Sequence, residues 1–232
     1  MNKTNPYAND LEQNDANYAP LSPITFIRRA SEVYPNRCAV IYGEVQRSWR
    51  ETYQRCCQLA SALNKIGIGS DDTVALMLPN VPAMLEAHFA IPMAGGVINA
   101  LNIRLDSDAI AFMLEHGNAK VLLTDKEFSS VVERAVAQLS NKPIIIDVDD
   151  VNVHSGKLLG KFEYEAFLAS GDKNFDWQLP ENEWQAIALG YTSGTTGNPK
   201  GVVTHHRGAH LNSLSNILAW NMTAFPTYLW TL

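Results

Sequence analysis

The residues best suited to chemistry lie in one short segment, YTSGTTGNPKGV, which runs from Tyr191 to Val202. Its three glycines permit positive φ angles and a close approach of the backbone to a bound group. Its serine and threonine hydroxyl groups belong to Thr192, Ser193, Thr195 and Thr196. Backbone N–H groups that point into such a turn bind phosphate oxygens, and Lys200 adds a positive charge beside them. The segment therefore predicts a phosphate-binding loop.

The order of residues in this segment differs from two commoner nucleotide-binding motifs. The P-loop motif GxxxxGK[ST] requires glycine five residues after its first glycine, whereas Pro199 stands fifth after Gly194. The GxG at Gly67 and Gly69 does not open a dinucleotide-binding turn, because Asp72 stands where the third glycine belongs. A flexible solvated loop is the alternative for a segment of this composition. The strand-like runs on both sides and the stiff proline before the lysine favour the binding loop.

The histidines offer a second kind of site, a metal centre, which their spacing does not favour. His205 and His206 are adjacent and would diverge at a strand end, and no carboxylate joins them and His210 at ligand spacing. We therefore predict no metal site and expect the three histidines to line or support the loop. His88 and His116 fall within predicted helices, where we expect solvated or hydrogen-bonded structural roles.

Composition and charge narrow the classes of protein. The chain has 232 residues, of which 46% are hydrophobic and 18% charged, which is typical of a globular protein. Its net charge is -6 and its basic residues are scattered, which argues against nucleic acid as a partner. Cys38, Cys56 and Cys57 show no CxxC spacing, and we interpret them as small apolar residues in a protein of the reducing cytoplasm.

Two further segments bear on targeting. Residues 1–20 are polar and lack the basic flank and apolar stretch of a secretory signal, so we expect a flexible lead. The most apolar long window, VPAMLEAHFAIPMAGGVINAL, contains Glu86, His88 and two prolines, whose burial in lipid would be costly. We predict a core segment there and no membrane span.

The periodicity of the chain predicts strands that alternate with helices. A helix from Ser22 to about Tyr34, a hairpin over 38–49 and a helix ending near Gly67 come first. The later strands are expected at 73–78, 97–101, 119–125, 143–148, 186–192 and 201–205. The later helices are expected at 82–93, 106–117, 127–139 and 207–220, with a surface loop at 149–160. Strands separated by helices of this length call for parallel pairing with right-handed crossovers.

The last residues, PTYLWTL, form a mostly apolar, strand-like run without a closing turn. We expect from this a truncated chain. A natural C-terminal strand at a sheet edge is the alternative.

The string YTSGTTGNPKGVV resembles the phosphate-binding signature of the adenylate-forming superfamily, which includes acyl-CoA synthetases, luciferases and peptide-synthetase adenylation domains. The stretch PMAGGVINALNIRLDSDAIAFMLEHGNAKVLLTD is similar to bacterial fatty-acyl-CoA synthetases and plant acyl-activating enzymes. This resemblance implies an α/β fold of mostly parallel sheets flanked by helices, part of the large N-terminal domain of such an enzyme. Residues 21–232 would be a partial AMP-binding domain, with the C-terminal domain absent.

The resemblance also implies a reaction. A carboxylic acid, here expected to be a fatty acid, would react with ATP to give acyl-AMP, and CoA would then take the acyl group, with Mg²⁺ as a further cofactor. The residues implied to grip the β- and γ-phosphates are Thr192, Ser193, Thr195, Thr196 and Lys200, with Gly194 and Gly197 shaping the loop. Lys200 would bind and stabilise charge without acting as a base.

Motifs that the family carries further along its sequence are missing from this chain. We therefore predict no catalytic residue within it and no turnover by the chain alone, while its oligomeric state stays open. Two alternatives remain: a non-catalytic truncated gene product, and an adenylating enzyme whose acceptor is a carrier-protein thiol.

Overall fold

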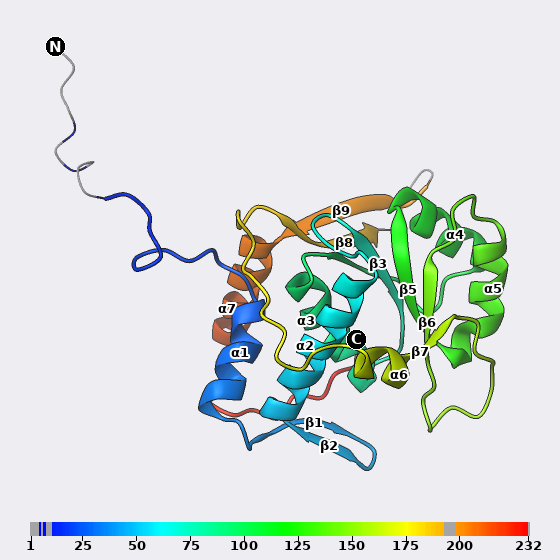
Figure 1. Ribbon diagram of the computed structural model, residues 1–232, viewed down its shortest axis with the longest axis horizontal. Helices are drawn as coiled ribbons and strands as arrows, with labels where there is room; N and C mark the ends of the chain where they lie inside the picture. The colour runs from blue at the N-terminus through cyan, green and yellow to red at the C-terminus, as the bar shows by residue number, and fades with distance from the viewer. Residues whose placement is uncertain (1–4, 6, 8–10, 193–197, 232) are drawn as a thin grey trace.

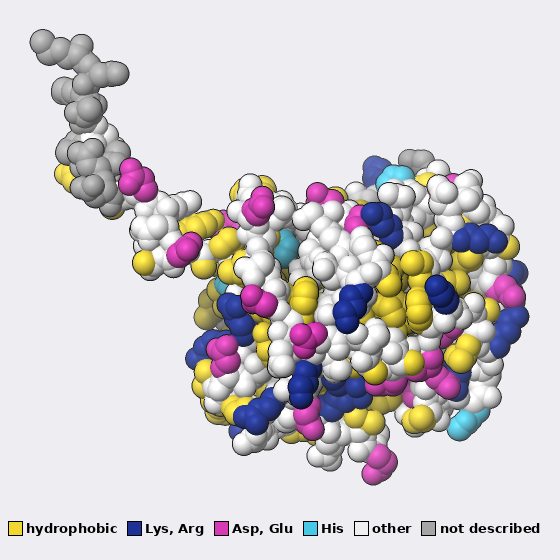
Figure 2. Space-filling view, in the orientation of Figure 1, with side chains coloured by type: hydrophobic (Ala, Val, Ile, Leu, Met, Phe, Trp, Pro, Cys, Tyr) yellow, Lys and Arg dark blue, Asp and Glu magenta, His cyan; other side chains and the backbone are white. Residues whose placement is uncertain are grey.

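The computed structural model describes residues 5, 7, 11–192 and 198–231 of the chain. A seven-stranded sheet lies between helices on both of its faces, and residues 11–19 extend away from this body (Figure 1 and Figure 2). The strand order is β7-β6-β5-β3-β4-β8-β9. The pairings from β7 to β8 are parallel, and β9 runs antiparallel beside β8. The predicted α/β fold, a mostly parallel sheet flanked by helices, is thus confirmed.

The strands of this sheet are short apolar runs. They are β3 (Thr73–Met77), β4 (Val97–Ala100), β5 (Ala119–Asp125), β6 (Ile144–Val148), β7 (Phe162–Glu163), β8 (Ala186–Thr192) and β9 (Lys200–His205). All residues of β3 are buried, as expected for a parallel strand that is covered on both faces. The crossovers between these strands place the helices on the two faces of the sheet.

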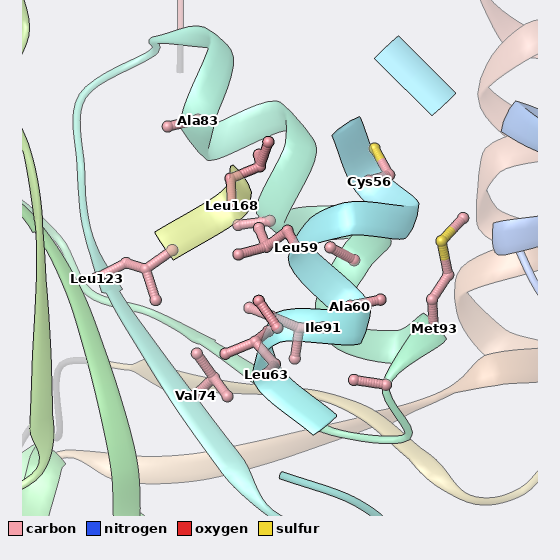
Figure 3. Close-up of a cluster of buried hydrophobic side chains, with 14 of the residues drawn as sticks. Cys56, Leu59, Ala60, Leu63, Val74, Ala83, Ile91, Met93, Leu123 and Leu168 are labelled. Carbon is pink, nitrogen blue, oxygen red and sulfur yellow. The ribbon is translucent and has the colours of Figure 1, made fainter. Parts of the chain in front are cut away.

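Two apolar cores lie on opposite faces of the sheet. One contains residues of α1 (Ile24–Val33), α2 (Trp49–Lys65), α3 (Pro82–Met93) and α6 (Tyr164–Ala169). The other contains residues of α4 (Ser107–His116) and α5 (Ser129–Ala137), and a 3-10 turn at Lys126–Phe128 precedes α5. Figure 3 shows Leu63 of α2 beside Ile91 of α3, next to Val74 of β3. The last helix, α7 (His206–Ala219), follows β9.

A separate hairpin of β1 (Cys38–Tyr42) and β2 (Val45–Ser48) leads into α2. Gly43 turns the hairpin with a φ of +55°, a backbone conformation that favours glycine. The Ser48 hydroxyl accepts a hydrogen bond from the Glu51 N–H, and the Glu51 carboxylate accepts one from the Ser48 N–H. This capping box fixes the start of α2 at Trp49, so the hairpin ends at Ser48, one residue earlier than predicted.

Glu86 lies on α3 with 1% of its surface exposed. Its Oε1 accepts hydrogen bonds from Arg47 Nη1 at 2.5 Å and from Arg55 Nε at 2.7 Å. Its Oε2 accepts one from the Tyr164 hydroxyl at 2.6 Å. These three donors offset the large cost of burying a carboxylate, and they join β2, α2 and α6 to α3. The apolar window at residues 81–101, which contains Glu86, is therefore part of the core, as predicted.

In the described part of the chain, no helix has both the length and the apolar character needed to cross a bilayer.

Two regions differ from the predicted elements. Residues 162–169 form β7 and α6, which were not predicted, because a strand of two residues and a helix of six are too short to show a period. The strand-like prediction for PTYLWTL is wrong for residues 226–231, which form neither helix nor strand. Instead, Trp230 packs against the α3 side of the core, where its carbonyl accepts a hydrogen bond from Asn80 Nδ2 at 3.1 Å.

Residues 11–19 of the N-terminal lead are exposed and contain no helix or strand. The boundary of this lead at residue 20 stays a prediction.

The three cysteines differ in burial. Cys56 and Cys57 are buried in α2, where burial raises the pKa of both thiols, and Cys38 is exposed. The interpretation of Cys56 and Cys57 as small core residues is confirmed.

Candidate functional site

The predicted phosphate-binding segment joins β8 to β9 at the carboxyl end of β8. Its first residue, Thr192, ends β8, and Lys200 begins β9 directly opposite in the antiparallel ladder. Five of the predicted site residues lie outside the described residues, namely Ser193, Gly194, Thr195, Thr196 and Gly197. The structure therefore places the two ends of the segment and brings Thr192 and Lys200 together.

Directly paired residues of an antiparallel ladder point to the same face of the sheet, so Thr192 and Lys200 share a face. On the α3 face of β8, a groove of about 280 Å³ is bounded by Gly190, Thr192 and Val202 and by His88 of α3. Ala188 and Gly190, the small residues of β8 that line this groove, leave space in it. A hydroxyl donor and an ammonium group at the ends of the segment can both bind anionic oxygens, with the lysine adding a charge-assisted bond.

His88 faces this groove in a defined tautomer. Its Nδ1 lies 2.8 Å from the carbonyl oxygen of Met84, and because a carbonyl only accepts, Nδ1 carries the hydrogen. Burial lowers the pKa of His88, which favours the neutral imidazole. The hydrogen-bonded role expected for His88 is confirmed.

The opposite face of β8 is held by α4. The hydroxyl of Tyr191 lies 2.8 Å from Nδ1 of His116, the last residue of α4, and 3.4 Å from the carbonyl oxygen of Met113. The Tyr191 ring meets Phe112 and His116 edge-on, with centroid distances of 6.4 and 5.7 Å. The sequence analysis missed this contact, although Tyr191 directly precedes Thr192 and must point to the other face of the strand.

The three clustered histidines lie where β9 passes into α7. His205 Nδ1 accepts a hydrogen bond from the Gly208 N–H, which caps α7, and its ring lies 4.4 Å from that of Trp184. His206 is buried, with Nδ1 2.8 Å from the Ser22 hydroxyl, and burial lowers its pKa to about 4.

His210 completes this group of histidines, and its ring lies 4.6 Å from Phe26 of α1. The histidines thus support α7 and its contact with α1, and their effect on the loop stays a prediction. Among residues 5, 7, 11–192 and 198–231, no group of three or more His, Cys, Asp or Glu side chains could hold a metal ion.

Comparison with curated proteins identifies close relatives. The acetate–CoA ligase CCL3 of Humulus lupulus is 48% identical over 235 residues, a match that covers 96% of this chain and 41% of the relative. The acetate/butyrate–CoA ligase AAE7 of Arabidopsis thaliana, named as peroxisomal, is 47% identical with the same coverage. The chain spans about two fifths of the length of these relatives.

Solved structures share the fold. A long-chain-fatty-acid–CoA ligase of Archaeoglobus fulgidus matches with a TM-score of 0.75 at 19% identity, over 90% of this chain and 41% of that one. A benzoate–CoA ligase of Burkholderia xenovorans LB400 matches with a TM-score of 0.70 at 18% identity, over 85% of this chain and 36% of that one. A family model described as AMP-binding enzyme covers residues 27–232, and the chain therefore belongs to the AMP-binding enzyme family.

Proposed function

We propose that this chain is part of an enzyme that activates a carboxylic acid with ATP and transfers the acyl group to CoA. The observation that carries the proposal is the placement of Thr192 and Lys200 opposite each other, at the two ends of a Ser/Thr/Gly segment and beside a groove. The family match and the CoA ligase names of the relatives support this class of reaction.

The reaction has two steps. A carboxylate oxygen bonds to the α-phosphorus of ATP while the bond to the β-phosphate oxygen breaks, which gives acyl-AMP and pyrophosphate. The sulfur of CoA then bonds to the acyl carbon, and AMP leaves. In the first step negative charge builds on the phosphate oxygens, so donors placed around them lower the barrier.

The role of this chain is to hold the β- and γ-phosphates. The donors proposed are the hydroxyls of Thr192, Ser193, Thr195 and Thr196 and the ammonium of Lys200, with Gly194 and Gly197 shaping the loop. Mg²⁺ would supply further positive charge when bound to the phosphates. Lys200 stabilises charge and takes no proton, because the attacking carboxylate needs no base.

The names of the relatives favour a small acid as substrate. Relatives of this chain are named for acetate, butyrate, benzoate and trans-cinnamate. We therefore propose a short-chain or aromatic carboxylic acid, and keep the fatty acid suggested by the sequence resemblance as the second candidate. A panel of acids from acetate to palmitate, with benzoate and cinnamate, separates the two.

Carboxylate-dependent exchange between ATP and pyrophosphate tests the function. The experiment compares residues 1–232 with a version extended to the length of the relatives. We expect exchange from the extended protein and none from residues 1–232. Exchange by residues 1–232 would contradict the prediction that they are insufficient, and no exchange by either protein with any acid would favour the non-catalytic alternative.

A lysine substitution tests the site itself. In the extended protein, Lys200→Ala should lower the exchange rate on the order of 10²-fold, because it removes a charged donor from the transition state. Lys142→Ala, at an exposed lysine distant in sequence, is the matched control and should change nothing. Equal rates for the two variants would remove the role of Lys200. Replacing CoA by a carrier-protein thiol in the second half-reaction tests the remaining alternative.

The compartment is proposed to be the cytoplasm. Two of the three free cysteines are buried, which suits a reducing environment. Because several relatives are named as peroxisomal, imaging of a tagged protein decides between the two compartments.

A further inference from the structure

Tyr191 and His116 form a contact that joins β8 to the end of α4. The hydroxyl–Nδ1 distance is 2.8 Å, and Phe112, one turn earlier in α4, stacks on His116 with a centroid distance of 5.3 Å. Two side chains of α4 thus contact the ring of Tyr191, the residue that directly precedes Thr192 in β8.

Two glycines allow α4 and the two strands to approach this closely. A Cβ at Gly117, just after α4, would lie 2.9 Å from the Met113 carbonyl oxygen and 3.2 Å from Leu189. A Cβ at Gly201, which pairs with Tyr191 across the ladder, would lie 3.1 Å from Leu189 and 3.6 Å from His116. The contact therefore includes β9 as well as β8.

The ladder connects this contact with the other face of the sheet. Tyr191 and Gly201 form one pair, and Thr192 and Lys200 form the next, whose side chains point to the α3 face. Figure 1 shows α4 beside the ends of β8 and β9. We propose that the Tyr191–His116 contact is a positioning element that fixes Thr192 and Lys200 in the orientation needed to bind phosphate, an inference that rests on the proposed function.

The chemistry of the contact makes it independent of the charge on His116. A neutral imidazole with a bare Nδ1 accepts the phenol hydrogen. An imidazolium donates from Nδ1 to the phenol oxygen, and the phenol hydrogen then points to the Met113 carbonyl oxygen at 3.4 Å. In both charge states Nδ1 of His116 makes the hydrogen bond to the Tyr191 hydroxyl. Variants that keep or move the polar atom at this position therefore test the proposal.

The test uses three variants of the 232-residue chain and a fourth as control. Tyr191→Phe keeps the ring and removes the hydroxyl. His116→Asn keeps a polar atom near the position of Nδ1, whereas His116→Gln places its polar atoms near the position of Nε2. Tyr228→Phe, at an exposed tyrosine, is the matched control. The first measurement is amide hydrogen exchange in β8 and β9 without ligand, and the second is ATP titration followed by amide chemical shifts.

We expect Tyr191→Phe and His116→Gln to speed exchange at Thr192 and Lys200 and to weaken ATP binding about three- to tenfold, the range of one lost hydrogen bond. His116→Asn and Tyr228→Phe should stay near wild type. Unchanged exchange in Tyr191→Phe, or equal behaviour of the Asn and Gln variants, would overturn the proposal. If the wild-type 232-residue chain binds no ATP, the titration is repeated on the extended protein. Absence of ATP binding there would count against the proposed function, and the exchange data would then decide the positioning role.

Discussion

The core around α2 and α3 and the region of β9 and α7 bury very different shares of their apolar side chains. Leu59, Leu63 and Ile91 are fully buried in the core, whereas Val203 of β9 is 63% exposed and Leu218 of α7 is 80% exposed. The segment proposed to bind phosphate therefore begins in β8 and ends in β9, which belongs to the less packed region. Where few packing contacts hold a strand, single hydrogen bonds such as Tyr191–His116 gain importance.

The largest effect is expected at Glu86, which ties four elements of the packed region together. Glu86→Ala would leave Arg47, Arg55 and the Tyr164 hydroxyl without their buried acceptor, and should lower the free energy of unfolding by about 3–5 kcal/mol. Urea denaturation measures the loss. The control is Glu165→Ala, which removes the half-exposed partner of Arg55 and should cost less than about 1 kcal/mol. Similar losses in both variants would show that the buried network is not what stabilises this region.

The next effect tests packing without charge. Leu63 is fully buried among α2, α3 and β3, so Leu63→Ala should lower the free energy of unfolding by about 2–5 kcal/mol, through lost apolar burial and a residual cavity. The same denaturation series checks it. A loss below about 1 kcal/mol would mean that the core is loosely packed, and the contrast with α7 would then lose its basis.

The sequence predicted the packed region better than the open one, for physical reasons. Val74 and Leu76 lie in an uninterrupted apolar run, which is typical of a parallel strand covered on both faces. The run at Tyr228–Trp230 is also apolar, yet it forms no strand, because Trp230 packs against the core that contains α3. A local pattern cannot distinguish these outcomes, since the partner lies far away in the sequence.

The candidate site shows the same limit. The order of residues between Thr192 and Lys200 predicted a phosphate-binding loop, and alternation in β8 and β9 explains why its two ends share a face. His116 could not be linked to Tyr191 from the sequence, because 75 residues separate them and only the fold brings α4 against β8. Positioning contacts of this kind require the tertiary structure.

A pH-dependent effect connects the two regions, because His206 at the start of α7 contacts Ser22, just before α1. Burial, and next the nearby His205, lower the pKa of His206 to about 4, while an unfolded histidine titrates near about 6.5. Between these values the unfolded chain binds more protons, so the free energy of unfolding should fall as the pH drops through 6.5 towards 4. The loss should reach at most about 3 kcal/mol.

Urea denaturation at several pH values, compared between wild type and His206→Gln, isolates this contribution from that of the carboxylates. The variant should show a flatter dependence between pH 6.5 and 4. His154→Gln, at an exposed histidine of the 149–160 loop, should keep the wild-type slope. Identical slopes in wild type and His206→Gln would mean that His206 is not buried as a neutral imidazole.

The smallest effect is expected on the open face of α7. Leu218→Ser replaces a side chain that is 80% exposed and should change the free energy of unfolding of the 232-residue chain by less than about 0.5 kcal/mol. Urea denaturation at two protein concentrations measures it. A loss above about 1 kcal/mol, or one that grows with concentration, would show that this face is covered in solution, because a serine is costly only where the leucine is removed from water. The contrast between the two regions would then describe an interface and not an open surface.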